Sequence, residues 1–156
     1  MIKILFICHG NICRSPMAEF IFKDMLKRKG LENKFTVASS ATSTEEIYCG
    51  VGNPIYPPAR RILNEHGISC DGKRAVLFTK ADYDKYDIIL VMDNNNVRNI
   101  MRIVGADTQC KIHKLLEFCD GGDVADPWYS GDFESCYNDI ERGCNALIDK
   151  LIKEIG

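Results

Sequence analysis

Two hydrophobic periods follow one another along this chain, and their succession predicts strands that alternate with helices. Residues 2–7 are a nearly continuous apolar run with β-branched members, which is typical of a strand buried on both faces of a parallel sheet. Residues 87–92 carry a second such run. Weaker strands are expected over residues 34–39 and 111–115.

The helical segments show apolar residues at intervals of three and four. The first begins near Ser15 and Pro16, because a proline at the first helical position and Glu19 in the first turns favour a helix start, and it ends at Gly30. Further helices are expected over residues 59–66, 79–85, 94–104 and 133–155, and residues 42–58 form a long irregular stretch. Strands alternating with helices predict a parallel, doubly wound sheet.

Composition places the chain among ordinary globular proteins and excludes some functions. The 156 residues suffice for one domain, which we expect to span 1–156. The 20 basic and 22 acidic side chains give a net charge of −2, so nucleic acid is not an expected partner. No stretch approaches the roughly 20 apolar residues of a membrane span. The N-terminus lacks a signal sequence, and we expect a cytoplasmic protein.

Eight cysteines are too dispersed for a disulfide framework or a zinc site. None lies in C-x-x-C spacing, and a cytosolic chain of this size seldom carries disulfides. We therefore expect no metal and no cofactor, and most of the cysteines are expected to be small buried hydrophobes. Cys8 and Cys13 are the exceptions.

The most informative segment runs from Cys8 to Ser15. Cys8 ends the first predicted strand, Arg14 follows it in C-x5-R spacing, and a helix begins directly afterwards. A loop of this length can wrap around one tetrahedral oxyanion with its N–H groups pointing inward. Ligands of parallel sheets bind at the carboxyl ends of the strands, which is where this loop lies.

The residue types in the loop suit attack on phosphorus. A cysteine thiol is mostly protonated at neutral pH, but a helix N-terminus, Arg14 and the Ser15 hydroxyl all favour a Cys8 thiolate. The planar guanidinium of Arg14 can bind two phosphate oxygens at once. Gly10 permits a close backbone approach, and Asn11 tolerates a left-handed conformation and can brace the loop.

A thiolate attack on a phosphate ester also needs a proton donor for the leaving oxygen. Asp126 is the best candidate, because Trp128 and Tyr129 follow it and could form walls for a flat substrate. Asp120 and Asp123 are rivals that spacing alone does not exclude.

At these residues the chain resembles the low-molecular-weight protein tyrosine phosphatases. The family motif matches in full over residues 7–16, and the late Asp-Pro-aromatic-Tyr matches residues 126–129. Residues 64–68 and 91–93 also look like family segments, so the resemblance covers essentially the whole chain. It implies an α/β fold of three layers, a doubly wound four-stranded parallel sheet with helices on both faces.

The resemblance implies a two-step reaction on phosphotyrosine proteins or peptides, with inorganic phosphate as a product. Cys8 forms a phosphocysteine, and Asp126 protonates the tyrosine oxygen and then activates water. Arg14 binds phosphate and stabilises the transition state.

The resemblance also implies roles for residues around this centre. Asn11, Ser15 and Ser39 support the loop, and His66 and Asp93 form a structural pair. Cys13 is the resolving partner that traps oxidised Cys8 as a reversible disulfide. Phosphate and substrate are expected to contact His9, Gly10, Asn11, Ile12, Cys13, Arg14, Ser15, Tyr48, Trp128 and Tyr129.

Substrate selection is where the chain departs from the family pattern. Relatives that act on phosphoarginine carry a threonine where this chain has Ile12, and the isoleucine favours phosphotyrosine. Family members often place an aromatic after Thr-Ser-x, but here Glu45 and Glu46 follow, and residues 48–51 look inserted. Tyr48 could replace the missing wall, or the acidic loop over residues 44–53 could alter peptide preference.

Three other functions compete with this interpretation. A thioredoxin-coupled arsenate reductase uses a similar fold, but it needs two further cysteines on a mobile segment, and none follows Thr79 until Cys110. A phosphoarginine phosphatase of the same fold is the second. A non-catalytic phosphate-binding or redox-sensing module is the third, although a binder needs neither an activated thiolate nor an acid.

Overall fold

A parallel sheet of four strands, in the order β2-β1-β5-β6, forms the centre of the molecule. The computed structural model of the chain describes residues 1–155. The strands of this sheet are β1 (Ile2–Cys8), β2 (Phe35–Ala41), β5 (Ile88–Val91) and β6 (Ile112–Lys114). The helices are α1 (Arg14–Lys29), α2 (Pro57–Glu65), α3 (Lys80–Lys85), α4 (Asn94–Val104), α5 (Pro127–Ser130) and α6 (Phe133–Ile155), with 3-10 turns η1 (Glu32–Lys34) and η2 (Leu115–Phe118). The predicted fold class is confirmed.

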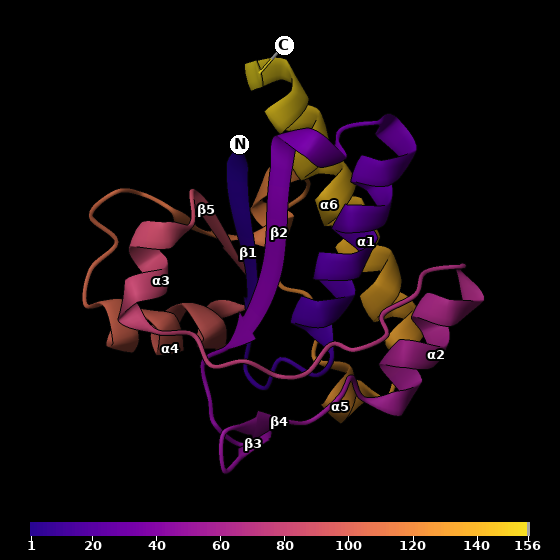
Figure 1. The fold of residues 1–156 in the computed structure, drawn as a ribbon, viewed down its shortest axis with the longest axis vertical. Coiled ribbons are helices and arrows are strands. Elements are labelled where there is room, and N and C mark those ends of the chain that lie inside the picture. Colours follow the sequence, from indigo (N-terminus) through magenta and orange to yellow (C-terminus); the bar gives the residue numbers. More distant parts are fainter. Residues whose placement is uncertain (156) are drawn as a thin grey trace.

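Alternating side chains of β1 divide the core into two layers. Ile4 and Phe6 pack in a cluster with apolar residues of α1, α2 and α6, whereas Leu5 and Ile7 face a second cluster that includes residues of α3 and α4. Figure 1 shows α1, α2 and α6 on one side of the sheet and α3 and α4 on the other. Both faces of β1 are therefore buried, as its unbroken apolar run predicted.

The register of the strands brings three chain segments to one edge of the sheet. Cys8 at the end of β1 pairs with Ala41 of β2, and Ile7 pairs with Val91 of β5. The loops that follow these strands therefore leave the sheet side by side. This edge carries the candidate site, as expected for a parallel sheet.

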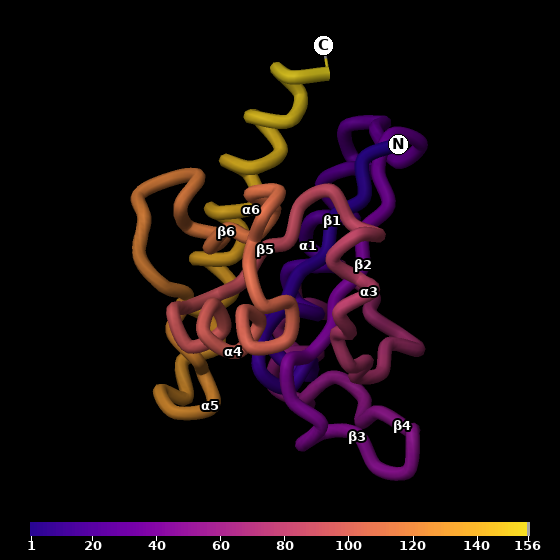
Figure 2. Tube along the Cα trace, turned by 90° about the vertical axis from the view of Figure 1, so that its left-hand side faces the viewer, coloured from indigo at the N-terminus to yellow at the C-terminus, as the bar shows by residue number. Residues whose placement is uncertain are grey.

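Residues 42–58, expected to be irregular, contain a small hairpin of β3 (Ile47–Tyr48) and β4 (Val51–Gly52). Its two turn residues, Cys49 and Gly50, have φ angles of 50° and 78°, the left-handed pair that tight two-residue turns require. The hairpin projects beyond the carboxyl ends of the strands (Figure 2).

Most other predicted boundaries hold to within one or two residues. The second strand extends to Ala41 instead of ending at Ser39, because Ser39 and Ser40 are buried polar residues inside it. The helix expected over 59–66 begins at Pro57 and ends at Glu65. Among residues 1–155, no helix is both long and apolar enough to span a membrane.

Candidate active site

Cys8 lies at the end of β1, directly in front of the N-terminus of α1. Its Sγ accepts hydrogen bonds from the backbone N–H groups of Asn11, at 3.3 Å, and Ser15, at 3.4 Å. The hydroxyl of Ser15 lies 3.0 Å from the same sulfur. Two N–H donors, a hydroxyl and a helix N-terminus therefore surround a sulfur that is almost completely buried, and their positive ends can stabilise a negative charge on it.

Arg14 opens α1 and is held from two other segments. Its Nη1 donates to Oδ2 of Asp93 at 2.7 Å and to the carbonyl oxygen of Val124 at 2.9 Å. Burial alone would lower the pKa of Arg14, but the negative charges of Cys8 and Asp93 raise it above its ordinary value. The guanidinium is thus a fixed cation beside the sulfur.

Asp126 lines the same cavity as Cys8 and caps the N-terminus of the short helix α5. Its Oδ1 accepts the N–H of Trp128 at 3.0 Å, and its Oδ2 lies 3.5 Å from Nη2 of Arg14. The two rivals lie elsewhere: Asp123 pairs with Lys114 at 2.8 Å, and Asp120 contacts Cys119 and Arg142 on the surface. Of the three aspartates, only Asp126 lines the cavity that holds Cys8.

A chain of buried polar side chains lies beneath the loop. The amide of Asn11, which has a φ of 58°, donates to Oγ of Ser15 at 2.8 Å and to Oγ of Ser39 at 3.0 Å. Its carbonyl oxygen accepts the N–H of Val76 at 3.0 Å. Through these three hydrogen bonds the side chain of Asn11 links the loop, β2 and the segment after α2.

This row of hydrogen-bonded side chains ends at a buried carboxylate, that of Glu19, which the sequence analysis did not identify as part of the site. Ser39 donates to Oε1 of Glu19 at 2.6 Å, and Lys23 and Lys73 lie 2.6 and 3.6 Å from the Glu19 carboxylate. Burial lowers the pKa of Lys73, against the attraction of Glu19. The helix begins at Arg14, close to the expected start, and the Glu19 carboxylate in its second turn faces inward and closes the network under Cys8.

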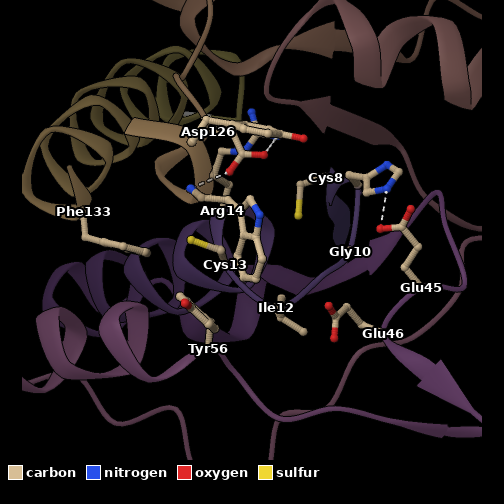
Figure 3. A pocket seen from close by; sticks show the side chains of 13 residues that line it. Cys8, Gly10, Ile12, Cys13, Arg14, Glu45, Glu46, Tyr56, Asp126 and Phe133 are labelled. Carbon is tan, nitrogen blue, oxygen red and sulfur yellow. Dashed lines mark hydrogen bonds and ion pairs between the residues drawn. The ribbon is translucent and has the colours of Figure 1, made fainter. Parts of the chain in front are cut away.

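The cavity above Cys8 has a volume of about 220 Å³ and mixed walls. Figure 3 shows Cys8, Arg14 and Asp126 converging on one side, with Glu45 and Glu46 at the opposite edge. Trp128, Tyr129, Tyr56 and Phe133 supply the aromatic surface. His9 also lines the cavity, and its Nε2 lies 3.0 Å from Oε2 of Glu45.

Two sequence-based expectations were wrong. Tyr48 does not form a wall of the cavity, because it lies on the projecting strand β3 with 66% of its surface exposed. His66 and Asp93 do not pair: the His66 ring stacks on Tyr137 with centroids 3.9 Å apart, and Asp93 holds Arg14 instead.

The site also contains residues that local sequence reasoning missed. Tyr56 and Phe133 line the cavity, and their rings stack with centroids 5.9 Å apart. Tyr56 lies in the stretch that was expected to be irregular, and Phe133 was interpreted as the start of the last helix, so neither was expected at the site. Only the signal at Glu19, a charged residue between the apolar residues of the first half of α1, was available in advance.

Cys13 lies in the cavity wall between the loop and α6. A hydrogen bond with Cys136, together with burial, raises the pKa of the Cys13 thiol. All eight cysteines are free thiols, including Cys8 and Cys13.

A buried thiol in a ring of N–H donors, an arginine and a carboxylic acid together define an enzyme that transfers a phosphoryl group to sulfur. A family model described as low molecular weight phosphotyrosine protein phosphatase matches residues 3–155. The chain belongs to this family, and it is a protein tyrosine phosphatase, a hydrolase.

Individual relatives agree over nearly their whole length. The chain is 39% identical over 157 residues to the phosphatase YfkJ of Bacillus subtilis, covering 99% of this chain and 98% of that protein. The crystal structure of YfkJ matches with a TM-score of 0.92 and 38% identity, covering 99% of this chain and 96% of that one. PtpA of Staphylococcus aureus is 36% identical over 156 residues, covering 99% of this chain and 96% of that protein.

A more distant structure adds a ligand. Vibrio vulnificus Wzb, solved in complex with benzylphosphonate, matches with a TM-score of 0.82 and 27% identity, covering 96% of this chain and 98% of that one. These relatives favour neither the arsenate reductase nor the phosphoarginine phosphatase.

Proposed function

We propose that this protein hydrolyses phosphotyrosine through a phosphocysteine intermediate, with Cys8 as nucleophile, Asp126 as general acid and base, and Arg14 as the phosphate-binding cation. The observation that carries the proposal is the convergence of Asn11 and Ser15 N–H groups on the Cys8 sulfur, in the cavity that Asp126 lines.

In the first step the Cys8 thiolate forms a bond to phosphorus while the bond from phosphorus to the tyrosine oxygen breaks. Protonated Asp126 gives its proton to that oxygen, so a neutral phenol leaves. The equatorial oxygens carry the negative charge, and they face the guanidinium of Arg14 and the N–H groups of the loop.

In the second step Asp126, now a carboxylate, takes a proton from water. The water oxygen bonds to phosphorus, the bond between sulfur and phosphorus breaks, and inorganic phosphate leaves. The same carboxyl group thus acts as acid and then as base, and Cys8 returns as the thiolate.

The walls of the cavity support an aromatic phosphate ester as the substrate. Trp128 and Tyr56 lie with ring centroids 5.1 Å apart, and Ile12 adds an apolar contact. The benzylphosphonate in the Wzb complex carries a six-membered aromatic ring, as phosphotyrosine does. We propose phosphotyrosine proteins or peptides as the physiological class, hydrolysed in the cytoplasm.

A redox role for Cys13 belongs to the same proposal. A peroxide would oxidise the Cys8 thiolate to a sulfenic acid, and the sulfur of Cys13 would then bond to the Cys8 sulfur with loss of water. The resulting disulfide would block turnover until a thiol reduced it. Both thiols line the catalytic cavity, which supports this route.

The decisive experiment looks for the covalent adduct. Rapid-quench mass spectrometry with a phosphotyrosine peptide should find a phosphate group on Cys8 of the wild type. With p-nitrophenyl phosphate, whose leaving group needs no proton, Asp126→Ala should accumulate more of this adduct than the wild type, because the variant lacks the base of the second step. Cys8→Ser should bind inorganic phosphate without turnover, whereas Cys119→Ser, an exposed thiol outside the cavity, should keep full activity. The absence of any adduct on Cys8 in both proteins would overturn the mechanism.

A further inference from the structure

A second, mainly apolar groove adjoins the catalytic cavity on the side of α2. The two hollows share three lining residues, Ile12, Glu46 and Tyr56. Beyond Tyr56 the groove continues over Pro54, Ile55 and Pro57. A peptide whose phosphotyrosine enters the cavity would therefore place its next residue over this groove.

Glu46 stands at the boundary between the two hollows, and Asn53 holds it there. The side-chain amide of Asn53 donates to Oε2 of Glu46 at 2.7 Å, and the backbone N–H of Asn53 donates to the Glu46 carbonyl oxygen at 2.8 Å. Figure 3 shows the Glu46 carboxylate beside Ile12 at the edge of the cavity. Its position is thus set before any ligand arrives.

The other charges along the groove are of both signs, and one of them is already paired. Arg60 pairs with Asp71 at 2.7 Å. Arg61 and Glu65 stand four residues apart on α2 and are opposite in charge, but they form no ion pair within 4.0 Å. No cationic side chain of residues 1–155 lies within 4.0 Å of the Glu46 carboxylate. Glu46 is therefore a charge without an ion-pair partner among these residues, at the place where the groove and the catalytic cavity meet.

A fixed carboxylate close to a phosphate-binding loop repels the substrate's own phosphate unless a cation accompanies it. The Glu46 Cγ would lie only 3.2 Å from a Cβ placed on Gly10 of the loop. Lysine and arginine combine an apolar stem with a charged end, and they can cover an apolar surface while the charge reaches a carboxylate.

We propose that this groove is a subsite for a lysine or arginine adjacent to the phosphotyrosine of the substrate. The aliphatic stem lies over Ile12 and Ile55, and the cation meets Glu46. The inference rests on the proposed phosphotyrosine phosphatase function and adds the class of sequence that the enzyme prefers. Because the contact is solvent-exposed, its effect on kcat/KM is expected to be about two- to fivefold.

The test compares phosphotyrosine hexapeptides that differ at one position, with lysine, norleucine or glutamate directly before or directly after the phosphotyrosine. The wild type should hydrolyse the lysine peptide with a kcat/KM about two to five times that of the norleucine peptide, at one of the two positions. The glutamate peptide should be the poorest. The differences in kcat/KM between the peptides should become smaller as the salt concentration rises, because salt screens exposed charges.

Glu46→Gln should abolish the lysine advantage. Glutamine keeps an oxygen that can accept from Asn53, so the loop conformation is retained while the charge is lost. Because each result is a ratio between two peptides, a general change in activity cancels. Glu45→Gln is the matched control, since Glu45 already pairs with His9 and should leave the ratio unchanged.

A second variant tests the groove without touching the carboxylate. Asn64→Trp places a large ring among the groove residues and should also reduce the lysine advantage, whereas Lys85→Trp on α3, on the far side of the sheet, should not. Equal kcat/KM for all peptides, or a lysine advantage that survives Glu46→Gln, would overturn the subsite. Failure of the wild type to hydrolyse any phosphotyrosine peptide would instead overturn the proposed function.

Discussion

Asp93 holds the guanidinium of Arg14 from a segment 79 positions away in the sequence, with Nη1 and Oδ2 only 2.7 Å apart. The same carboxylate accepts the N–H of Asn96 through Oδ1 at 2.8 Å and thereby caps α4. Asp93 therefore ties the orientation of Arg14 to α4, which covers the opposite face of the sheet from α1.

Asp93→Ala is expected to lower kcat about 10- to 100-fold, because Arg14 loses the contact that aims it at the transition state. Inhibition by inorganic phosphate should change less, since the positive charge remains. Asp93→Asn should recover only part of the activity, because its single amide oxygen can replace either the contact with Arg14 or the helix cap, and its NH2 group then faces another donor. Steady-state kinetics on phosphotyrosine check this, and unchanged kcat in a folded Asp93→Ala protein would contradict it.

Asp126→Ala should lower kcat on phosphotyrosine by about 10²–10³-fold, the range of general acid catalysis. The loss should be smaller for p-nitrophenyl phosphate, whose leaving group needs no proton. Asp123→Ala is the control, because Asp123 pairs with Lys114 outside the cavity and should retain activity near that of the wild type. Full activity of Asp126→Ala on phosphotyrosine would mean that another group is the acid.

Limited alkylation should distinguish the two thiols of the cavity, Cys8 and Cys13, by their rates of labelling. The hydrogen bond with Cys136 and burial raise the pKa of Cys13, so it stays protonated at pH 7 and reacts slowly with iodoacetamide. Mass spectrometry should therefore find the label on Cys8 well before Cys13. Cys136→Ala removes the hydrogen bond and should speed labelling of Cys13, and equal labelling rates of Cys8 and Cys13 in the wild type would count against this assignment.

Lys73 predicts a pH dependence of stability. Burial lowers the pKa of Lys73 below its unfolded value of 10.5, so between these two values the unfolded chain binds more protons. The contribution of Lys73 to the free energy of unfolding should therefore rise with pH in this window and level off above 10.5.

Urea unfolding of the wild type and Lys73→Met at pH 7.5 and pH 10 measures this contribution. The stability of the wild type relative to the variant should increase toward the higher pH. A difference that stays constant, or that shrinks, would show that Lys73 titrates in the same range in both states.

Chelation should leave activity intact. Arg14 and the loop N–H groups provide the positive charge that the transition state needs, so no step of the proposed reaction uses a metal ion. Dialysis against EDTA followed by an assay with phosphotyrosine checks this expectation, and activity that returns only when a divalent cation is added would contradict it.

Local patterns predicted the elements that carry the reaction. The run ending at Cys8 and the apolar rows of α1, α4 and α6 have periods that a single segment displays on its own, and the helices at 94–104 and 133–155 were predicted with the observed bounds. The C-x5-R spacing lies within one loop, so Cys8 and Arg14 were recognisable together.

Residues that meet only through folding escaped prediction. Tyr56 and Phe133 stack from α2 and α6 across the cavity mouth, and nothing near either residue indicates the other. The expected partner of Asp93 was His66, but Asp93 lies beside Arg14, because the register of β1 and β5 brings their ends together. The prediction that Tyr48 forms a wall of the cavity was wrong because Tyr48 lies on a hairpin that projects away from the cavity.

The sequence by itself determined the candidate nucleophile, the arginine that follows it, the order of strands and helices, and the family, since each depends on spacing along the chain. Only the tertiary structure decided which aspartate lines the cavity with Cys8, where the network from Asn11 to Glu19 ends, and that Glu46 stands between two hollows. The physical reason is that charge and hydrogen bonding act over a few ångströms of space, whereas these residues are separated by many positions of sequence.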